Sequence, residues 1–178
     1  GVIIASETSS ATNSRGQYRN QNNNANSDGK YHLTSYDTSA VSWGTTAHDS
    51  IYNTYQLDCV AGEFVWTGWD YIGEPTPWNG TGSGSVSHNG PIPNSSYFGI
   101  VDTAGFEKDT YYLYRSQWNK DSTTLHLVTA WDSDNMYTTD VKTPVVIYSN
   151  APKVELYRNG DLIGTATRST HTSSAGHI

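Results

Sequence analysis

The stretch Val2-Ile3-Ile4-Ala5-Ser6-Glu7-Thr8-Ser9-Ser10 joins a short apolar run to a single carboxylate and a cluster of hydroxyl groups. A continuous β-branched run is typical of a buried strand in a parallel sheet. In α/β proteins, the residues that carry out chemistry lie at the carboxyl ends of such strands. The sequence therefore predicts a buried strand over residues 2–5 and marks Glu7, which follows it, as a candidate catalytic residue.

Composition limits the classes of function that the chain can serve. Its 178 residues fit one domain or two partial ones. A net charge of -7 with only 10 Lys and Arg residues argues against a nucleic-acid partner, because phosphate binding needs clustered basic side chains. Cys59 is the only cysteine, which excludes an intrachain disulfide and a cysteine-based zinc site, and we expect it to be buried. No apolar stretch approaches the roughly 20 residues of a membrane-spanning helix.

The first two thirds of the chain alternate between predicted strands and helices. After a surface loop rich in Asn and Ser, apolar residues at near-helical spacing predict a helix over residues 37–57, with Asp37 as its cap. The stretch of residues 61–75 has an aromatic and β-branched core that predicts a second buried strand and ends in turn residues. A short strand at 95–102 and a helix at 108–118 follow. This alternation is that of βα units.

Residues 122–178 are predicted to be all-β. Short strand candidates occur at residues 125–128, 145–148 and 154–157, and Asn159-Gly160 is a strong signal for a type I′ hairpin. Alternation after Lys153 favours one sheet of a sandwich. Because the chain begins inside a predicted strand and ends soon after the hairpin, we expect both domains to be parts of a longer protein.

Five stretches of the sequence resemble β-galactosidases of glycoside hydrolase family 2. In order, they are residues 6–16 (SETSSATNSRG), 62–78 (GEFVWTGWDYIGEPTPW), 95–102 (SSYFGIVD), 114–118 (YRSQW) and 154–160 (VELYRNG). The resemblance implies an α/β part followed by an all-β part. Residues 1–121 would be the last two βα units of a TIM (β/α)8 barrel catalytic domain. Residues 122–178 would be the first portion of an immunoglobulin-like β-sandwich.

The resemblance also implies roles for individual side chains. The family hydrolyses terminal β-galactosides with retention, using two carboxyl groups roughly 5 Å apart. Glu7 matches the nucleophile, Trp66 the aromatic floor of the galactose pocket, and Glu74 a carboxylate that binds sugar hydroxyls. Three further residues of the same stretch could line the pocket or its rim, and packing explains them equally well: Trp69, Asp70 and Trp78. The acid/base of the family follows an Asn on an earlier barrel strand, and this chain has no Asn-Glu dipeptide. We therefore expect the chain alone to be inactive.

No cofactor or metal is predicted for this chain, because its six histidines show no metal-ligand spacing. The resemblance allows a divalent or sodium ion elsewhere in the parent enzyme. The expected partners are a galactoside and the remainder of the parent protein. Low charge and loops rich in Asn, Ser and Tyr suggest an extracellular or cell-surface bacterial location, and a cytoplasmic location stays open.

Two alternatives stay open at the level of sequence. β-Glucuronidases and β-mannosidases share the family's barrel, and the run Gly73-Glu74-Pro75-Thr76-Pro77-Trp78 favours the galactosidase among them. The abundance of aromatic residues, with 13 Tyr and 6 Trp, also fits a non-catalytic carbohydrate-binding module.

Overall fold

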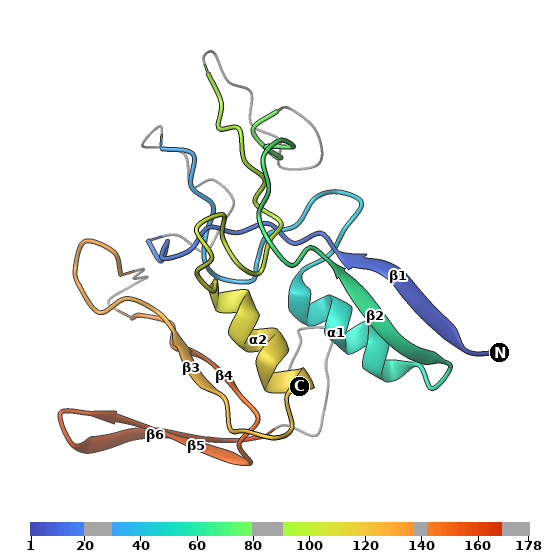
Figure 1. The fold of residues 1–178 in the computed structure, drawn as a ribbon. Coiled ribbons are helices and arrows are strands. Elements are labelled where there is room, and N and C mark those ends of the chain that lie inside the picture. The colour runs from blue at the N-terminus through green and yellow to red at the C-terminus, as the bar shows by residue number, and fades with distance from the viewer. Residues whose placement is uncertain (20–29, 80–90, 137–141, 169–178) are drawn as a thin grey trace.

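The computed structural model describes residues 1–19, 30–79, 91–136 and 142–168. Its first half is a βαβ unit followed by a second helix (Figure 1). Strand β1 (Ile3–Ser9) pairs in parallel with β2 (Val60–Trp66), and helix α1 (Ala47–Gln56) makes the crossover between them. Helix α2 (Asp109–Trp118) confirms the helix predicted at residues 108–118.

The second half is built from two antiparallel pairs. Strand β3 (Leu125–Val128) pairs with β4 (Val146–Ser149), and β5 (Lys153–Arg158) pairs with β6 (Asp161–Thr167). Asn159 and Gly160 join the last two strands with φ values of 53° and 95°, as a type I′ turn requires, which confirms the predicted hairpin. This hairpin lies at the far end of the molecule from β1 and β2 (Figure 1).

Helix α2 lies between the two halves and contributes to their shared core. Ala47 and Ile51 of α1 pack with Leu113 and Tyr114 of α2. The partly buried side chains that surround this cluster come from β2, the loop before α2, and β4: Val65, Ile100 and Tyr148. The two helices therefore join the parallel pair to the β3–β4 pair.

Helix α1 begins at Ala47, later than the start predicted at residue 37. Asp37 nevertheless caps it, because its two carboxylate oxygens accept hydrogen bonds from the backbone N–H groups of Ala47 (2.9 Å) and His48 (2.8 Å). The intervening residues form a loop that carries Asp37 back to the helix end. The sequence correctly predicted Asp37 as the cap of α1, but it did not predict the loop that separates Asp37 from the first residue of the helix.

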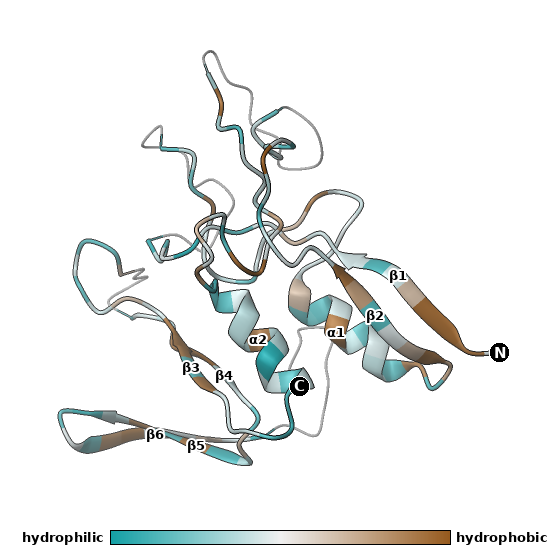
Figure 2. Cartoon of the chain, in the orientation of Figure 1, coloured by the Kyte–Doolittle hydropathy of each residue, from teal (hydrophilic) through white to brown (hydrophobic). Residues whose placement is uncertain are grey.

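Four expectations about burial and strands were wrong. The second strand was predicted to be buried, but its Phe64 and Trp66 are 66% and 38% exposed. The apolar side chains Val2, Ile3 and Ile4 are 78%, 54% and 59% exposed, because within the described residues β1 has only β2 as a neighbouring strand. Figure 2 shows that the first part of β1 consists of hydrophobic residues. Residues 95–102 form single bridges to the irregular loop after β2 rather than a strand. Cys59 is exposed in the turn before β2.

Within the ranges that the structure describes, no helix has the length and the apolar character needed to cross a membrane.

Candidate functional site

Glu7 lies in a β-bulge at the carboxyl end of β1. Ala5 pairs with Glu63 and Thr8 pairs with Val65, so β1 advances three residues while β2 advances two. The extra residue falls at Ser6 or Glu7, and bulges next to functional sites re-aim a side chain out of the regular alternation. Glu7 is exposed and lines a cleft of about 430 Å³ together with Trp43 and residues of α1.

Two hydroxyl groups bind one carboxylate beside the bulge. Thr8 Oγ1 donates a 2.7 Å hydrogen bond to Oε2 of Glu63, and Ser50 Oγ of α1 donates another of 2.7 Å to the same oxygen. Glu63, which lies in β2, thus links its own strand to the bulged strand β1 and to the crossover helix α1. Sequence reasoning missed Glu63, since it lies inside β2 rather than at its end.

The turn after β1 is held by a close backbone approach. Ser9 and Ser10 both have positive φ values, 69° and 57°, which non-glycine residues rarely adopt. The backbone N–H of Thr45 donates a 2.7 Å hydrogen bond to the carbonyl oxygen of Ser9. A Cβ atom on Gly44 would lie 2.3 Å from that oxygen, so only glycine fits there. The contact with the 40–45 loop therefore fixes the backbone conformation of the residues that follow Glu7.

Trp66, Tyr71 and Glu74 come together beside the end of β2. Trp66 pairs with Ser9, so it lies at the same edge of the sheet as Glu7. Its ring contacts Tyr71 edge-on, with 5.9 Å between the centroids, and the Tyr71 hydroxyl donates a short hydrogen bond to Glu74 Oε2. Partial burial and the Glu74 carboxylate raise the pKa of Tyr71 well above its usual value, so the phenol stays protonated and keeps donating. Sequence reasoning missed Tyr71.

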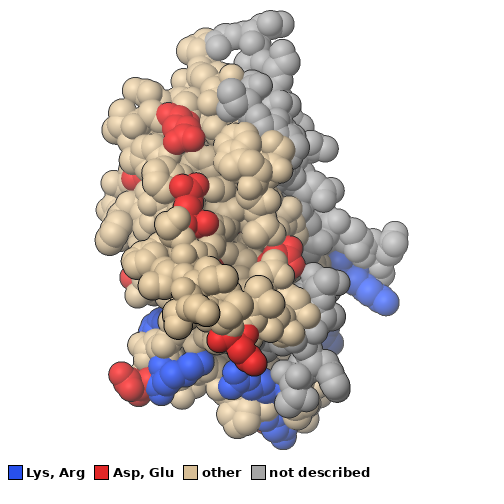
Figure 3. All heavy atoms as spheres, turned by 90° about the vertical axis from the view of Figure 1, so that its right-hand side faces the viewer, with Lys and Arg blue, Asp and Glu red and all other residues tan. Residues whose placement is uncertain are grey.

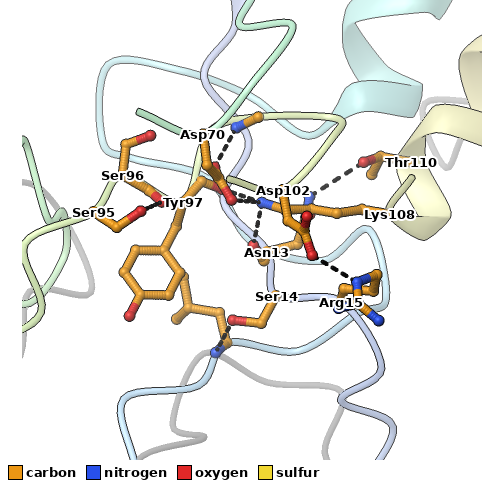
Figure 4. Close-up of polar contacts among 12 residues, drawn as sticks. Asn13, Ser14, Arg15, Asp70, Ser95, Ser96, Tyr97, Asp102, Lys108 and Thr110 are labelled. Atoms are coloured by element: carbon orange, nitrogen blue, oxygen red, sulfur yellow. Dashed lines mark hydrogen bonds and ion pairs between the residues drawn. The ribbon is translucent and has the colours of Figure 1, made fainter. Parts of the chain in front are cut away.

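The other predicted site residues are placed differently. Trp69 is 65% exposed on the loop after β2. Asp70 forms a 2.6 Å ion pair with the buried Lys108, while its second oxygen accepts a hydrogen bond from the N–H of Gly99 (Figure 4). Trp78 is 2% exposed and packs against Tyr31 and Tyr97. Of the three, only Trp69 offers an open surface to a ligand.

Across the described residues, no three His, Cys, Asp or Glu side chains form a group that could hold a metal ion.

Glu7 is an exposed carboxylate at the carboxyl end of a parallel strand, the position at which α/β-barrel enzymes carry their catalytic residues, and Trp66 and Glu74 follow at the end of the next strand and on its loop. Comparisons with known proteins find relatives that are glycosidases. A β-galactosidase of Bacteroides ovatus, BoGH2A, is 38% identical over 168 residues, which are 89% of this chain and 18% of that protein. A provisionally named β-glucuronidase of Formosa agariphila is 38% identical over 58% of this chain and 9% of its own length.

Solved structures agree with these relatives. A β-glycosidase from Bacteroides vulgatus matches 94% of this chain and 23% of its own chain with 27% identity and a TM-score of 0.70. Bacteroides uniformis β-glucuronidase 3 shares the fold over 98% of this chain and 21% of its own, with 20% identity and a TM-score of 0.59. A family model described as a domain of unknown function, DUF4982, matches residues 140–177.

The homologues of this chain are thus glycosidases of glycoside hydrolase family 2. The chain spans less than a fifth of the length of the curated relatives that it matches.

Proposed function

We propose that this chain is part of a retaining β-galactosidase in which Glu7 is the nucleophile. The observation that carries the proposal is the bulge that presents Glu7 at the same sheet edge as Trp66. An exposed carboxylate can attack an anomeric carbon, while an aromatic face beside it can stack on the apolar face of a sugar. The 38% identity with a β-galactosidase over most of the chain supports the same reading.

In the proposed reaction, a Glu7 oxygen attacks the anomeric carbon and the glycosidic bond breaks. The departing oxygen takes a proton from an acid outside this chain, and a glycosyl ester forms on Glu7. Water, deprotonated by that same group, then attacks the anomeric carbon and releases galactose and the free Glu7 carboxylate. Glu74 is assigned to binding the sugar hydroxyls because it matches the binding carboxylate of the family motif, and one of its oxygens accepts a hydrogen bond from Tyr71.

The fold expected for the parent enzyme is part of the proposal. Strands β1 and β2 would be the last two strands of a (β/α)8 barrel, and the strands from β3 onward would begin an immunoglobulin-like sandwich. Parallel strands joined through a crossover helix support the first assignment. The exposed apolar side chains of β1 support it too, because strands of a parallel barrel are normally covered on both faces.

The charges near the site favour a neutral sugar over a glucuronide. Glu7 at the end of β1 and the Tyr71–Glu74 pair on the loop after β2 are acidic or neutral, and a uronate carboxylate placed between them would be repelled. Two of the cations on the adjoining segments are paired with aspartates, Arg15 with Asp102 at 2.7 Å and Lys108 with Asp70 at 2.6 Å. The charged side chains visible in the upper half of Figure 3 are likewise acidic.

Trapping the intermediate tests the proposal. The full-length protein would be incubated with a 2-deoxy-2-fluoro β-galactoside that carries a good leaving group, and then digested for peptide mass mapping. We expect the added mass on the peptide that contains Glu7, with no labelling of Glu7→Gln and retained labelling of Glu74→Gln. Labelling at another carboxylate would remove Glu7 from the nucleophile role.

Substrate panels separate the remaining alternatives. Hydrolysis of 4-nitrophenyl β-galactoside in preference to the β-glucuronide and β-mannoside is expected for the full-length protein. Equal turnover of the glucuronide would overturn the galactoside assignment, and sugar binding without any turnover would point to a binding module. The 178-residue chain by itself should show no turnover, because the proposed acid/base lies outside it.

A further inference from the structure

Lys108 is a buried cation at the junction of three segments that are far apart in the sequence. It precedes helix α2 as its N-cap residue, and its side chain is only 2% exposed. Its Nζ atom lies 2.6 Å from Asp70 Oδ2, 2.8 Å from the carbonyl oxygen of Asn13 and 3.4 Å from that of Tyr97. An ammonium group has three donors, and here each has an acceptor (Figure 4).

These three acceptors belong to the segments around the candidate site. Asn13 follows β1 and the turn after Glu7, whereas Asp70 lies on the loop between Trp66 and Glu74. Tyr97 belongs to the segment that pairs with that loop. The Lys108 side chain therefore joins the segment after the candidate nucleophile to the loop that carries the candidate sugar-binding residues.

The ion pair between Lys108 and Asp70 also affects Tyr71, because Tyr71 directly follows Asp70 in the sequence. We call the contacts of Lys108 with Asp70, Asn13 and Tyr97 the Lys108 tie. The second oxygen of Asp70 accepts a 2.7 Å hydrogen bond from the N–H of Gly99, so both oxygens are engaged. Immediately after it, the N–H of Tyr71 donates to Ser96 Oγ at 3.0 Å, and the N–H of Ser96 donates to the Tyr71 carbonyl oxygen at 2.8 Å. The position of the Tyr71 side chain thus depends on the pairing that Asp70 and Lys108 hold together.

Burial makes this tie strong only while both charges are present. Desolvation lowers the pKa of Lys108 and raises the pKa of Asp70, so each ion needs the other to stay charged. Removing one partner leaves an uncompensated buried charge, whereas removing both leaves two neutral groups. The double replacement therefore removes the Lys108 tie without leaving a buried charge that would unfold the protein.

We propose that Lys108 is a positioning residue that holds the loop after Trp66, which bears Tyr71 and Glu74, in its substrate-binding place at the sheet edge that carries Glu7. The role rests on the proposed glycosidase function. Lys108 acts through Asp70 and the backbone of the two joined segments, and it does not touch the substrate.

The test compares Lys108→Met, the double variant Lys108→Met/Asp70→Asn and the surface control Lys153→Met in the full-length protein. Lys153 pairs with Glu155 on β5 and is half exposed. We expect the double variant to fold and to raise KM for 4-nitrophenyl β-galactoside about tenfold, with kcat within about threefold of the wild type, because the displaced side chains bind substrate without reacting. Lys153→Met should keep the wild-type constants.

Hydrogen exchange reports on the tie independently of activity. In the folded double variant, the amides of Asp70, Tyr71 and Ser96 should exchange about tenfold faster than in the wild type, whereas those of β5 and β6 should not change. A folded double variant with wild-type KM and wild-type exchange would overturn the proposal. If the wild-type protein were inactive, the proposed function and the positioning role would both be rejected. The exchange rates would still show whether Lys108 holds the two segments together.

Discussion

Thr8 Oγ1 donates a 2.7 Å hydrogen bond to Oε2 of Glu63, across the strand pair and one residue after Glu7. Thr8 is the first residue of β1 to regain its pairing after the bulge, opposite Val65. The bond therefore fixes the point at which the bulge ends. Since the bulge decides where Glu7 points, Thr8 and Glu63 together set the direction of the candidate nucleophile.

Replacing Thr8 with valine should impair catalysis more than substrate binding. The change keeps the β-branched shape and removes the hydroxyl that closes the bulge. We expect kcat of the full-length enzyme to fall about tenfold or more with KM nearly unchanged, because a misdirected nucleophile loses alignment with the reacting carbon. Steady-state kinetics with an aryl β-galactoside measures both constants.

Ser50→Ala is the matched control for Thr8→Val, since Ser50 donates to the same Glu63 oxygen from α1. Each variant should lose about 1.5 to 3 kcal/mol of unfolding free energy, as expected for a hydrogen bond to a charged group. Only Thr8→Val should lose kcat. An equal decrease of kcat in the two variants would mean that the hydrogen bonds of Glu63 affect activity only by stabilising the fold, and not by directing Glu7.

Tyr71→Phe should weaken substrate binding. The change keeps the ring that contacts Trp66 and removes the hydroxyl that donates to Glu74. With its partner gone, the Glu74 carboxylate is free to rotate, and we expect KM to rise about three- to tenfold with a smaller change in kcat. Kinetics on the full-length enzyme would show this split.

The chain offers a matched control for Tyr71. On β5, the Tyr157 hydroxyl donates a 2.7 Å hydrogen bond to Glu155 in a similarly exposed pair. Tyr157→Phe removes the same kind of bond far from the site, so KM should stay at its wild-type value. A comparable KM increase in both variants would contradict the assignment of Tyr71 to the sugar-binding loop.

Gly99→Ala should be strongly destabilising, whereas Gly68→Ala should be mild. A Cβ atom on Gly99 would lie 2.1 Å from the backbone nitrogen of Asp70 and 2.4 Å from the carbonyl carbon of Trp69. Backbone atoms cannot rotate away as a flexible side chain can, so the loop after β2 must move, at a cost of about 1 to 3 kcal/mol or more.

Gly68 belongs to the same loop, and a Cβ atom there would meet nothing within 4 Å. Thermal unfolding monitored by tryptophan fluorescence would compare the two variants with the wild type. A loss of stability in Gly68→Ala that equals the loss in Gly99→Ala would indicate general sensitivity of the loop instead of a steric clash at Gly99.

Local signals in the sequence predicted the elements whose partners lie nearby in the chain. The Asn159-Gly160 turn and its flanking strands needed only the two residues that accept positive φ. Helix α2 and the parallel strands also formed where the patterns indicated. Glu7, Trp66 and Glu74 were chosen from motifs, and the structure brings Trp66 and Glu74 together through Tyr71.

Features that depend on distant partners could not be predicted in this way. The late start of α1 follows from the folding back of Asp37 onto Ala47 and His48. Nothing in the sequence marks Lys108 as a buried cation, because its partners on the loops after β1 and β2 are known only once the chain has folded. Nor does any local pattern distinguish the buried Trp78 from the exposed Trp69.

His48 gives the stability of α1 a pH dependence of predictable sign. Its Nδ1 atom lies 2.6 Å from Asp37 Oδ2, and this hydrogen bond raises the pKa of the imidazole above 6.5 despite the opposing effect of burial. The folded state therefore holds the proton more tightly than the unfolded state. The contribution of His48 to stability is complete below about pH 6.5 and is lost as the pH rises through the folded-state pKa.

His48→Gln isolates this contribution. The difference in unfolding temperature between wild type and variant should be largest near pH 5.5 and should shrink as the pH rises toward 9, because the wild type loses its extra proton over that range. An NMR titration of the His48 ring should give a pKa above the reference value, and Asp37→Asn should lower it, since the charged partner is gone. A wild-type advantage that grows with pH would show that His48 is neutral in the folded protein and that Asp37 serves α1 only through the backbone N–H groups of Ala47 and His48.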